Sequence, residues 1–127
     1  MTNYKKAAVF AKPQGEIGGY LRALLSLLTD AGIEPYLDRM AAGYFPEGAP
    51  FPVLSDAALG ETCDIALVIG GDGRMLGAAR ALWPHNLPII GINAGRLGFI
   101  TDVTVEDMAR QIPLMLAGHA VKDERRF

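Results

Sequence analysis

The chain has 127 residues, of which half are hydrophobic and a fifth are charged, a composition typical of one globular domain and not of a disordered segment. Its formal net charge of −2 argues against a nucleic-acid-binding protein, which needs a basic face to neutralise phosphates. Cys63 is the single cysteine, so the sequence excludes an intrachain disulfide and a multi-thiolate metal site.

The apolar runs of the sequence are short. None approaches the roughly 18 to 20 residues of a membrane span, and the first run, residues 7–11, is too short for the core of a signal peptide. We therefore expect a soluble, cytoplasmic protein with no membrane partner and no nucleic-acid partner.

The first half of the chain alternates strand-like and helix-like patterns. Residues 5–11 form an apolar run typical of a buried strand, and residues 32–38 have the pattern of a second strand. Pro35 cannot donate to a ladder, which places the second strand near an edge of the sheet. Between them lies a helical pattern that ends at Ala31 and Gly32. Its apolar positions are Ile17, Leu21, Leu24, Leu25 and Leu28.

Residues 39–52 show no periodicity and are rich in proline and glycine. We interpret them as a surface excursion, although loops of this length are often functional. Residues 55–61 then predict one helical turn capped by Ser55.

The second half continues the alternation. Residues 65–69 and 87–93 are apolar on both alternating faces, as expected of central parallel strands covered by helices on both sides. Between them, a helical stripe ends at Pro84; its members are Met75, Leu76, Ala79, Leu82 and Trp83.

The last predicted helix begins at a capping-box-like sequence from Thr104 to Asp107. Pro113 falls inside its pattern and should kink or split the helix, because proline removes one backbone hydrogen bond. The expected buried face consists of Val105, Met108, Ile112, Met115 and Leu116. The charged end of the chain reads as a solvated segment.

This alternation predicts an α/β fold, a doubly wound, Rossmann-like parallel sheet. Ligands of such sheets bind beyond the carboxyl ends of the strands. The glycine-rich segments "GGDG" and "NAGRLGF" each follow a buried strand directly. We therefore expect both segments at the same edge of the sheet.

Residues 70–73, "GGDG", suit the binding of phosphate. Glycines let a ligand approach the backbone, and the following helix directs its positive end toward an anion. Arg74 can add a planar fork for phosphate. Asp72 would repel a phosphate unless it acts on the ligand, either by accepting a proton or by holding a magnesium ion. The alternative is that Asp72 only caps the helix and the glycines only turn the chain.

The two glycine segments together closely resemble the NAD kinase family. "GGDG" is also found in lipid kinases of the diacylglycerol type and in phosphofructokinases, but "GINAGRLGF", residues 91–99, is similar to NAD kinases in particular. The strong resemblance covers residues 64–102. It implies ATP-dependent phosphorylation of the 2′-hydroxyl of the adenosine ribose of NAD, which gives NADP, with Mg²⁺ or another divalent cation.

The resemblance also implies roles for particular residues. Asp72 would be the catalytic base that takes the proton from the ribose hydroxyl. Gly71, Gly73 and Leu76 would line the dinucleotide pocket, and Phe99 would pack against the adenine end of NAD.

Four further positions belong to the same pattern. Asn93 would bond back to the "GGDG" turn, and Gly95 would shape its own loop. Arg96 would be a phosphate contact or a solvated arm. Arg74 departs from the family, which often has Thr or Asn at this position. The resemblance therefore does not indicate which residue binds the phosphoryl donor here. No protein ligand to a metal is assigned.

The family pattern continues into a second, β-rich domain that this chain lacks. We expect an N-terminal nucleotide-binding domain at residues 1–120 and the start of a connection at residues 121–127. The isolated chain should be inactive, and the full-length protein a homo-oligomer that binds NAD and ATP. The alternatives are a noncatalytic nucleotide-binding module and a fragment of a diacylglycerol-type lipid kinase.

Overall fold

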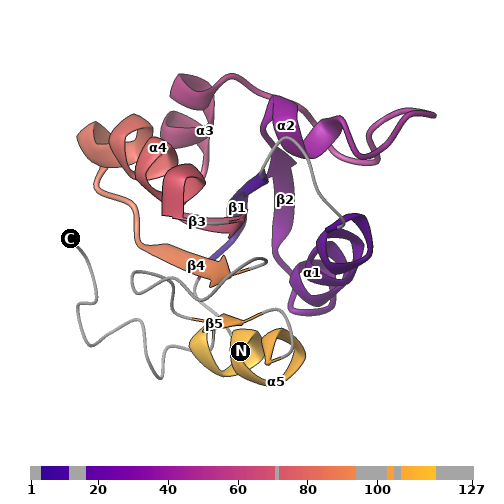
Figure 1. The fold of residues 1–127 in the computed structure, drawn as a ribbon. Helices are drawn as coiled ribbons and strands as arrows, with labels where there is room; N and C mark the ends of the chain where they lie inside the picture. Colours follow the sequence, from indigo (N-terminus) through magenta and orange to yellow (C-terminus); the bar gives the residue numbers. More distant parts are fainter. Residues whose placement is uncertain (1–3, 12–16, 71, 94–102, 105–106, 117–127) are drawn as a thin grey trace.

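The computed structural model describes residues 4–11, 17–70, 72–93, 103–104 and 107–116. One parallel sheet of five strands forms its centre, in the order β2-β1-β3-β4-β5 (Figure 1). The strands are β1 (Lys6–Ala11), β2 (Glu34–Leu37), β3 (Ile65–Gly70), β4 (Ile89–Asn93) and β5 (Val103–Thr104). The helices are α1 (Gly18–Asp30), α2 (Arg39–Ala42), α3 (Asp56–Thr62), α4 (Asp72–Leu82), the 3₁₀ helix η1 (Trp83–His85) and α5 (Met108–Leu116).

The core forms two layers, one on each face of the sheet. Alternate residues of β1 and β3 pack toward α1 and α5, and the residues between them pack toward α3 and α4 (Figure 1). Val9 and Leu67 belong to the first layer, Phe10 and Val68 to the second. Because strands buried on both faces need helices on both faces, this arrangement confirms the predicted doubly wound α/β fold.

The predicted α1 and its C-terminal stop are confirmed. All five expected apolar positions are buried: Ile17, Leu21, Leu24, Leu25 and Leu28. Gly32 adopts a φ of 81°, and the N–H groups of Gly32 and Ile33 donate to the carbonyls of Thr29 and Leu28. This pairing is a Schellman motif, which favours glycine because its backbone is left-handed. The following strand, β2, is an edge strand, as Pro35 predicted.

The interpretation of residues 39–52 as a plain surface excursion is wrong in part. They begin with the short helix α2, and the carboxylate of Asp38 caps it by accepting from the N–H of Ala41 at 2.8 Å. Three aromatic side chains of this segment pack against the core: Tyr44, Phe45 and Phe51. Arg22 of α1 holds the segment, since its guanidinium stacks 4.5 Å from the Phe45 ring and donates to the carbonyl of Tyr44 at 3.2 Å.

The helix capped by Ser55 is confirmed as α3, where the hydroxyl accepts from the N–H of Ala58 at 3.3 Å. Gly60 of α3 is buried against the His85 ring of η1.

The expected stripe of α4 is partly wrong. Leu82 is buried as expected, but Ala79 is only half-buried, its neighbour Ala78 is buried instead, and Trp83 is 71% exposed. The side chains of Met75 and Leu76 lie outside the described residues. The α-helix ends at Leu82 and gives way to η1, whose tighter winding carries Trp83 away from the buried face.

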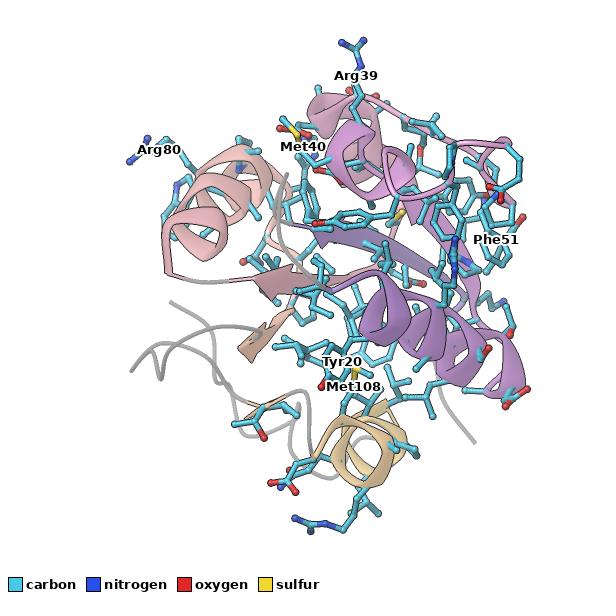
Figure 2. The ribbon with its side chains drawn as sticks, turned by 45° about the vertical axis from the view of Figure 1, so that its right-hand side comes forward. Tyr20, Arg39, Met40, Phe51, Arg80 and Met108 are labelled. Atoms are coloured by element: carbon cyan, nitrogen blue, oxygen red, sulfur yellow. The ribbon has the colours of Figure 1, made fainter. Side chains whose placement is uncertain are left out.

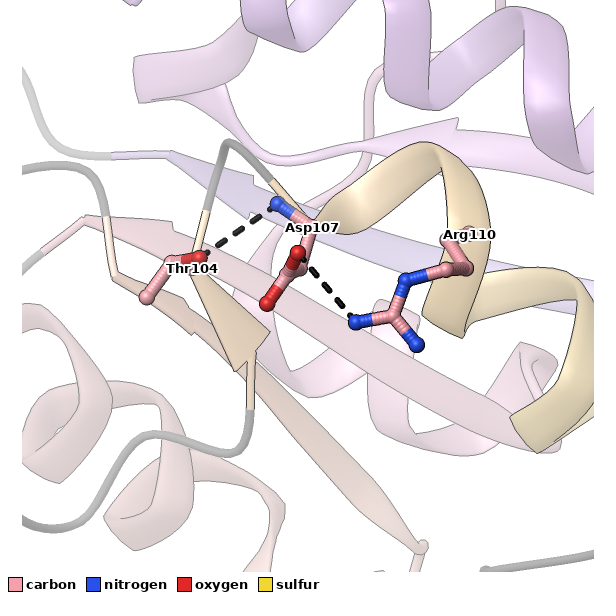
Figure 3. A network of polar contacts seen from close by, with 3 residues as sticks. All are labelled: Thr104, Asp107 and Arg110. Carbon is pink, nitrogen blue, oxygen red and sulfur yellow. Dashed lines mark hydrogen bonds and ion pairs between the residues drawn. The ribbon is translucent and has the colours of Figure 1, made fainter.

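The β5–α5 junction adds a strand that the sequence did not predict. Thr104 ends β5, and its hydroxyl accepts from the N–H of Asp107 at 3.3 Å, in the turn that precedes α5 (Figure 3). Asp107 pairs with Arg110 at 3.3 Å, and both side chains are largely exposed (Figure 3). The helix continues through Pro113 to Leu116, so it is not split there.

The buried face of α5 is confirmed at Met108, Ile112 and Leu116. Val105, the Met115 side chain and the expected domain boundary at residues 120–121 lie outside the described residues. Within the described part of the chain, no helix has the length and hydropathy to cross a membrane.

Candidate functional site

The two strands that precede the glycine-rich segments end side by side. Gly70, the last residue of β3, is the direct register partner of Asn93, the last residue of β4. Asn93 is in turn the partner of Thr104 in β5. The expectation that both segments start from the same edge of the sheet is therefore confirmed.

This edge is also where a ligand of such a sheet is expected. The chain moves outward from β1 to β2, then returns to place β3 on the other side of β1. The switch point of the topology therefore lies between β1 and β3, where Ala11 pairs with Ile69. Crevices at such switch points, beyond the carboxyl ends of the strands, are the usual ligand sites of open α/β sheets.

The structure places the backbone of most predicted site residues at this edge. Asp72, Gly73 and Arg74 form the first turn of α4, Leu76 lies in its second turn, and Asn93 ends β4. Because α4 starts two residues after β3, its positive end and its first N–H groups are directed to the carboxyl edge. Gly71 and Phe99 lie outside the described residues, as do Gly95 and Arg96.

The same edge carries a hollow that the sequence did not predict. It has a volume of about 350 Å³ and lies between the starts of α2 and α3. The described residues that line it are Asp38, Arg39, Met40, Ser55 and Asp56. The signals in the sequence were Asp38 and Ser55, two capping residue types, each just before a run that can form a helix.

Asp38 is the buried acid of this hollow. Only 1% of its surface is exposed, and its N–H donates to the carbonyl of Val9 at 3.1 Å, while its carboxylate caps α2. These bonds fix α2 to the end of β1. The rim, by contrast, is exposed: Arg39, Ser55 and Asp56 face solvent, and Met40 is 44% exposed.

Among the described residues, two groups have raised pKa values. Burial, with a smaller contribution from the neighbouring Asp64 charge, raises the pKa of the Cys63 thiol to about 12. Burial also raises the pKa of Tyr44. Cys63 is therefore a protonated, structural thiol in the layer beneath α3, and not a nucleophile.

Comparison with known proteins identifies the family. The chain matches the family model of the ATP-NAD kinase N-terminal domain over residues 53–120. It is 45% identical to the NAD kinase of Nitrosomonas europaea over 105 residues, which are 83% of this chain and 35% of that protein. It is 52% identical to the NAD kinase of Burkholderia cenocepacia over 77 residues, which are 61% of this chain and 26% of that protein.

A solved structure shares the fold. The crystal structure of yeast NADH kinase complexed with NADH superposes with a TM-score of 0.74 over 88% of this chain and 38% of that chain, at 13% sequence identity. The chain thus spans about a third of the length of these proteins. The match to the family model covers more than half of the chain and includes both glycine segments. The chain belongs to the NAD kinase family and corresponds to its N-terminal domain.

Proposed function

We propose that the full-length protein containing this chain transfers a phosphoryl group from ATP to the 2′-hydroxyl of the adenosine ribose of NAD, giving NADP and ADP. The observation that supports this most is the pairing of Gly70 with Asn93, because it brings the two segments that resemble NAD kinases to one edge of the sheet. We further propose that residues 1–120 form the nucleotide-binding domain and that residues 121–127 lead into a second domain, which completes the site.

Asp72 is the catalytic base of this proposal. Its carboxylate accepts the proton of the ribose 2′-hydroxyl, the freed oxygen bonds to the γ-phosphorus of ATP, and the bond from that phosphorus to ADP breaks. A carboxylate suits this task because it can accept a proton from a hydroxyl within hydrogen-bond reach, and Asp72 lies at the start of α4. Positioning and charge stabilisation supply most of the catalysis in phosphoryl transfer, so one domain alone should be inactive.

The nucleotides occupy the edge around Asp72. Gly71, Gly73 and Leu76 line the dinucleotide pocket, Asn93 holds the turn that follows β3, and Phe99 packs on the adenine. Arg74 contributes charge to the donor phosphates from the first turn of α4.

A divalent cation would enter with the donor. Mg²⁺ usually keeps several waters and is bound through one or two carboxylates and substrate phosphates, and not by a closed protein cage. When bound, the ion would neutralise charge on the phosphates. We also propose that the full-length protein is a cytoplasmic homo-oligomer.

The test uses the full-length protein with NAD, ATP and Mg²⁺, and measures NADP with an NADP-specific dehydrogenase. Asp72→Asn separates the base from a helix cap, because asparagine caps a helix as well as aspartate does but accepts no proton. We expect kcat to fall by about 10²- to 10⁴-fold. Asp30→Asn, an exposed acid at the end of α1, is the matched control and should retain full activity.

Three outcomes would contradict the proposal. Full activity of Asp72→Asn would show that Asp72 is not the catalytic base. Nucleotide binding without formation of NADP would favour a noncatalytic binding module. Phosphorylation of diacylglycerol in place of NAD would favour a lipid kinase.

A further inference from the structure

The hollow between α2 and α3 exists because β2 is short. β2 ends at Leu37, which is level with Val9, whereas β1 and β3 continue to Ala11 and Ile69. The missing length leaves space over the end of β2, and α2 fills only part of it. The bonds of Asp38 to Val9 and Ala41 hold α2 in place, so the hollow has a fixed wall.

The described lining combines one apolar side chain, Met40, with polar groups. Met40 is exposed to 44%, and its thioether lies on the side of α2 that faces α4 (Figure 2). Asp56 and Ser55 supply a carboxylate and a hydroxyl from the start of α3. Arg39 extends from α2 into solvent above the rim (Figure 2).

These groups match the parts of a nucleoside. A flexible, polarizable thioether packs well against a flat aromatic ring. An ionised carboxylate accepts two hydrogen bonds at once, which suits the vicinal hydroxyls of a ribose. A volume of about 350 Å³ lies at the lower end of the range of small-molecule sites, which is the size for a nucleoside and not for a whole dinucleotide.

The place of the hollow connects it to the proposed reaction. α3 and α4 pack together over one face of the sheet, with Leu59 and Leu82 in the same core layer. Their starts lie at the same edge of the sheet, because α4 follows β3 directly and α3 follows residues 52–54, which pair with Leu37 at the end of β2. A nucleotide whose base is in the hollow can thus extend its phosphates along this edge toward Gly70 and Asp72.

We propose that the hollow lined by Met40, Ser55 and Asp56 binds the nucleoside end of the phosphoryl donor. The inference rests on the proposed function for the direction of the phosphates, but the binding of a nucleoside triphosphate can be measured without it. Asp56 accepts from the ribose hydroxyls, and Met40 covers the base.

The test compares Asp56→Asn and Met40→Gln with Glu61→Gln in the full-length protein. Glu61 is an exposed acid at the opposite end of α3 and serves as the matched control. We expect the KM for ATP to rise about tenfold in Asp56→Asn, the size of one lost charged hydrogen bond, and severalfold in Met40→Gln. The KM for NAD should remain within twofold. Inhibition by inorganic tripolyphosphate, which has no nucleoside, should not change.

Failure of this inference can be distinguished from failure of the proposed function. If NADP is formed and both variants keep the wild-type KM for ATP, the hollow is not the nucleoside site. If no NADP is formed, calorimetric titration with ATP decides: weaker binding in Asp56→Asn but not in Glu61→Gln supports the hollow. Equal binding in all variants, or none in the wild type, overturns it.

Discussion

The contact between Gly60 and His85 gives the sharpest test of the packing between α3 and η1. A Cβ atom at Gly60 would lie 2.8 Å from Cγ and Nε2 of the His85 ring, closer than real Cβ contacts. Gly60→Ala should gain about 1 kcal/mol of helix propensity and lose about 2 kcal/mol to overpacking. We therefore expect a net loss of about 1 kcal/mol in the free energy of unfolding.

The effect of Gly60→Ala on the free energy of unfolding should change sign when the His85 ring is removed. In a His85→Ala background nothing opposes the new methyl group, so Gly60→Ala should raise the free energy of unfolding by about 1 kcal/mol. Urea unfolding followed by far-UV circular dichroism in all four variants measures this coupling. An equal loss of stability in both backgrounds would refute the reasoning, because the obstacle would then not be His85.

Three further predictions concern other contacts. Thr104→Ala should lower the free energy of unfolding by about 1 kcal/mol through loss of the hydroxyl's bond to the N–H of Asp107 in the turn before α5, whereas Thr104→Ser and Arg110→Ala should each change it by less than about 0.5 kcal/mol in the same urea titration. Arg22→Ala should lower the free energy of unfolding by about 1 kcal/mol, because the ring of Phe45 and the carbonyl of Tyr44 lose their contacts with the guanidinium. Arg80→Ala removes an exposed arginine and should be neutral, so equal effects of the two variants would contradict the contact. The pKa of Cys63 is about 12 in the folded chain and about 8.5 in the unfolded chain, so its contribution to stability is complete below pH 8.5 and decreases by up to about 1.4 kcal/mol per pH unit between pH 8.5 and 12. Cys63→Ala should show a shallower decrease in unfolding titrations over that range, and parallel curves would contradict a protonated buried thiol.

Long apolar patterns predicted the fold well. α1 was predicted at every buried position, because its apolar residues repeat at helical spacing over three turns. β3 and β4 were predicted as central strands because both of their faces are apolar. Short elements were missed, since β5 has two residues and α2 has four, too few for any period to show.

The position of Trp83 was wrong for a different reason. A stripe drawn at 3.6 residues per turn assumes that the helix continues, but α4 changes to a 3₁₀ helix immediately after Leu82. Pro84 was the available signal, because proline cannot continue a helix and often lies in its last turn or just beyond it.

The candidate site was predictable only where the backbone determines it. A parallel sheet brings the ends of neighbouring strands to one edge, so the pairing of Gly70 with Asn93 follows from sequence once both strands are recognised. The hollow beside Met40 and Asp56 does not follow in this way, because it depends on where β2 stops and on how α2 is anchored. In the proposed function, the glycine-rich segment after β3 marks the place of phosphoryl transfer. The hollow beside the short edge strand β2 is the proposed site for the nucleoside of the donor.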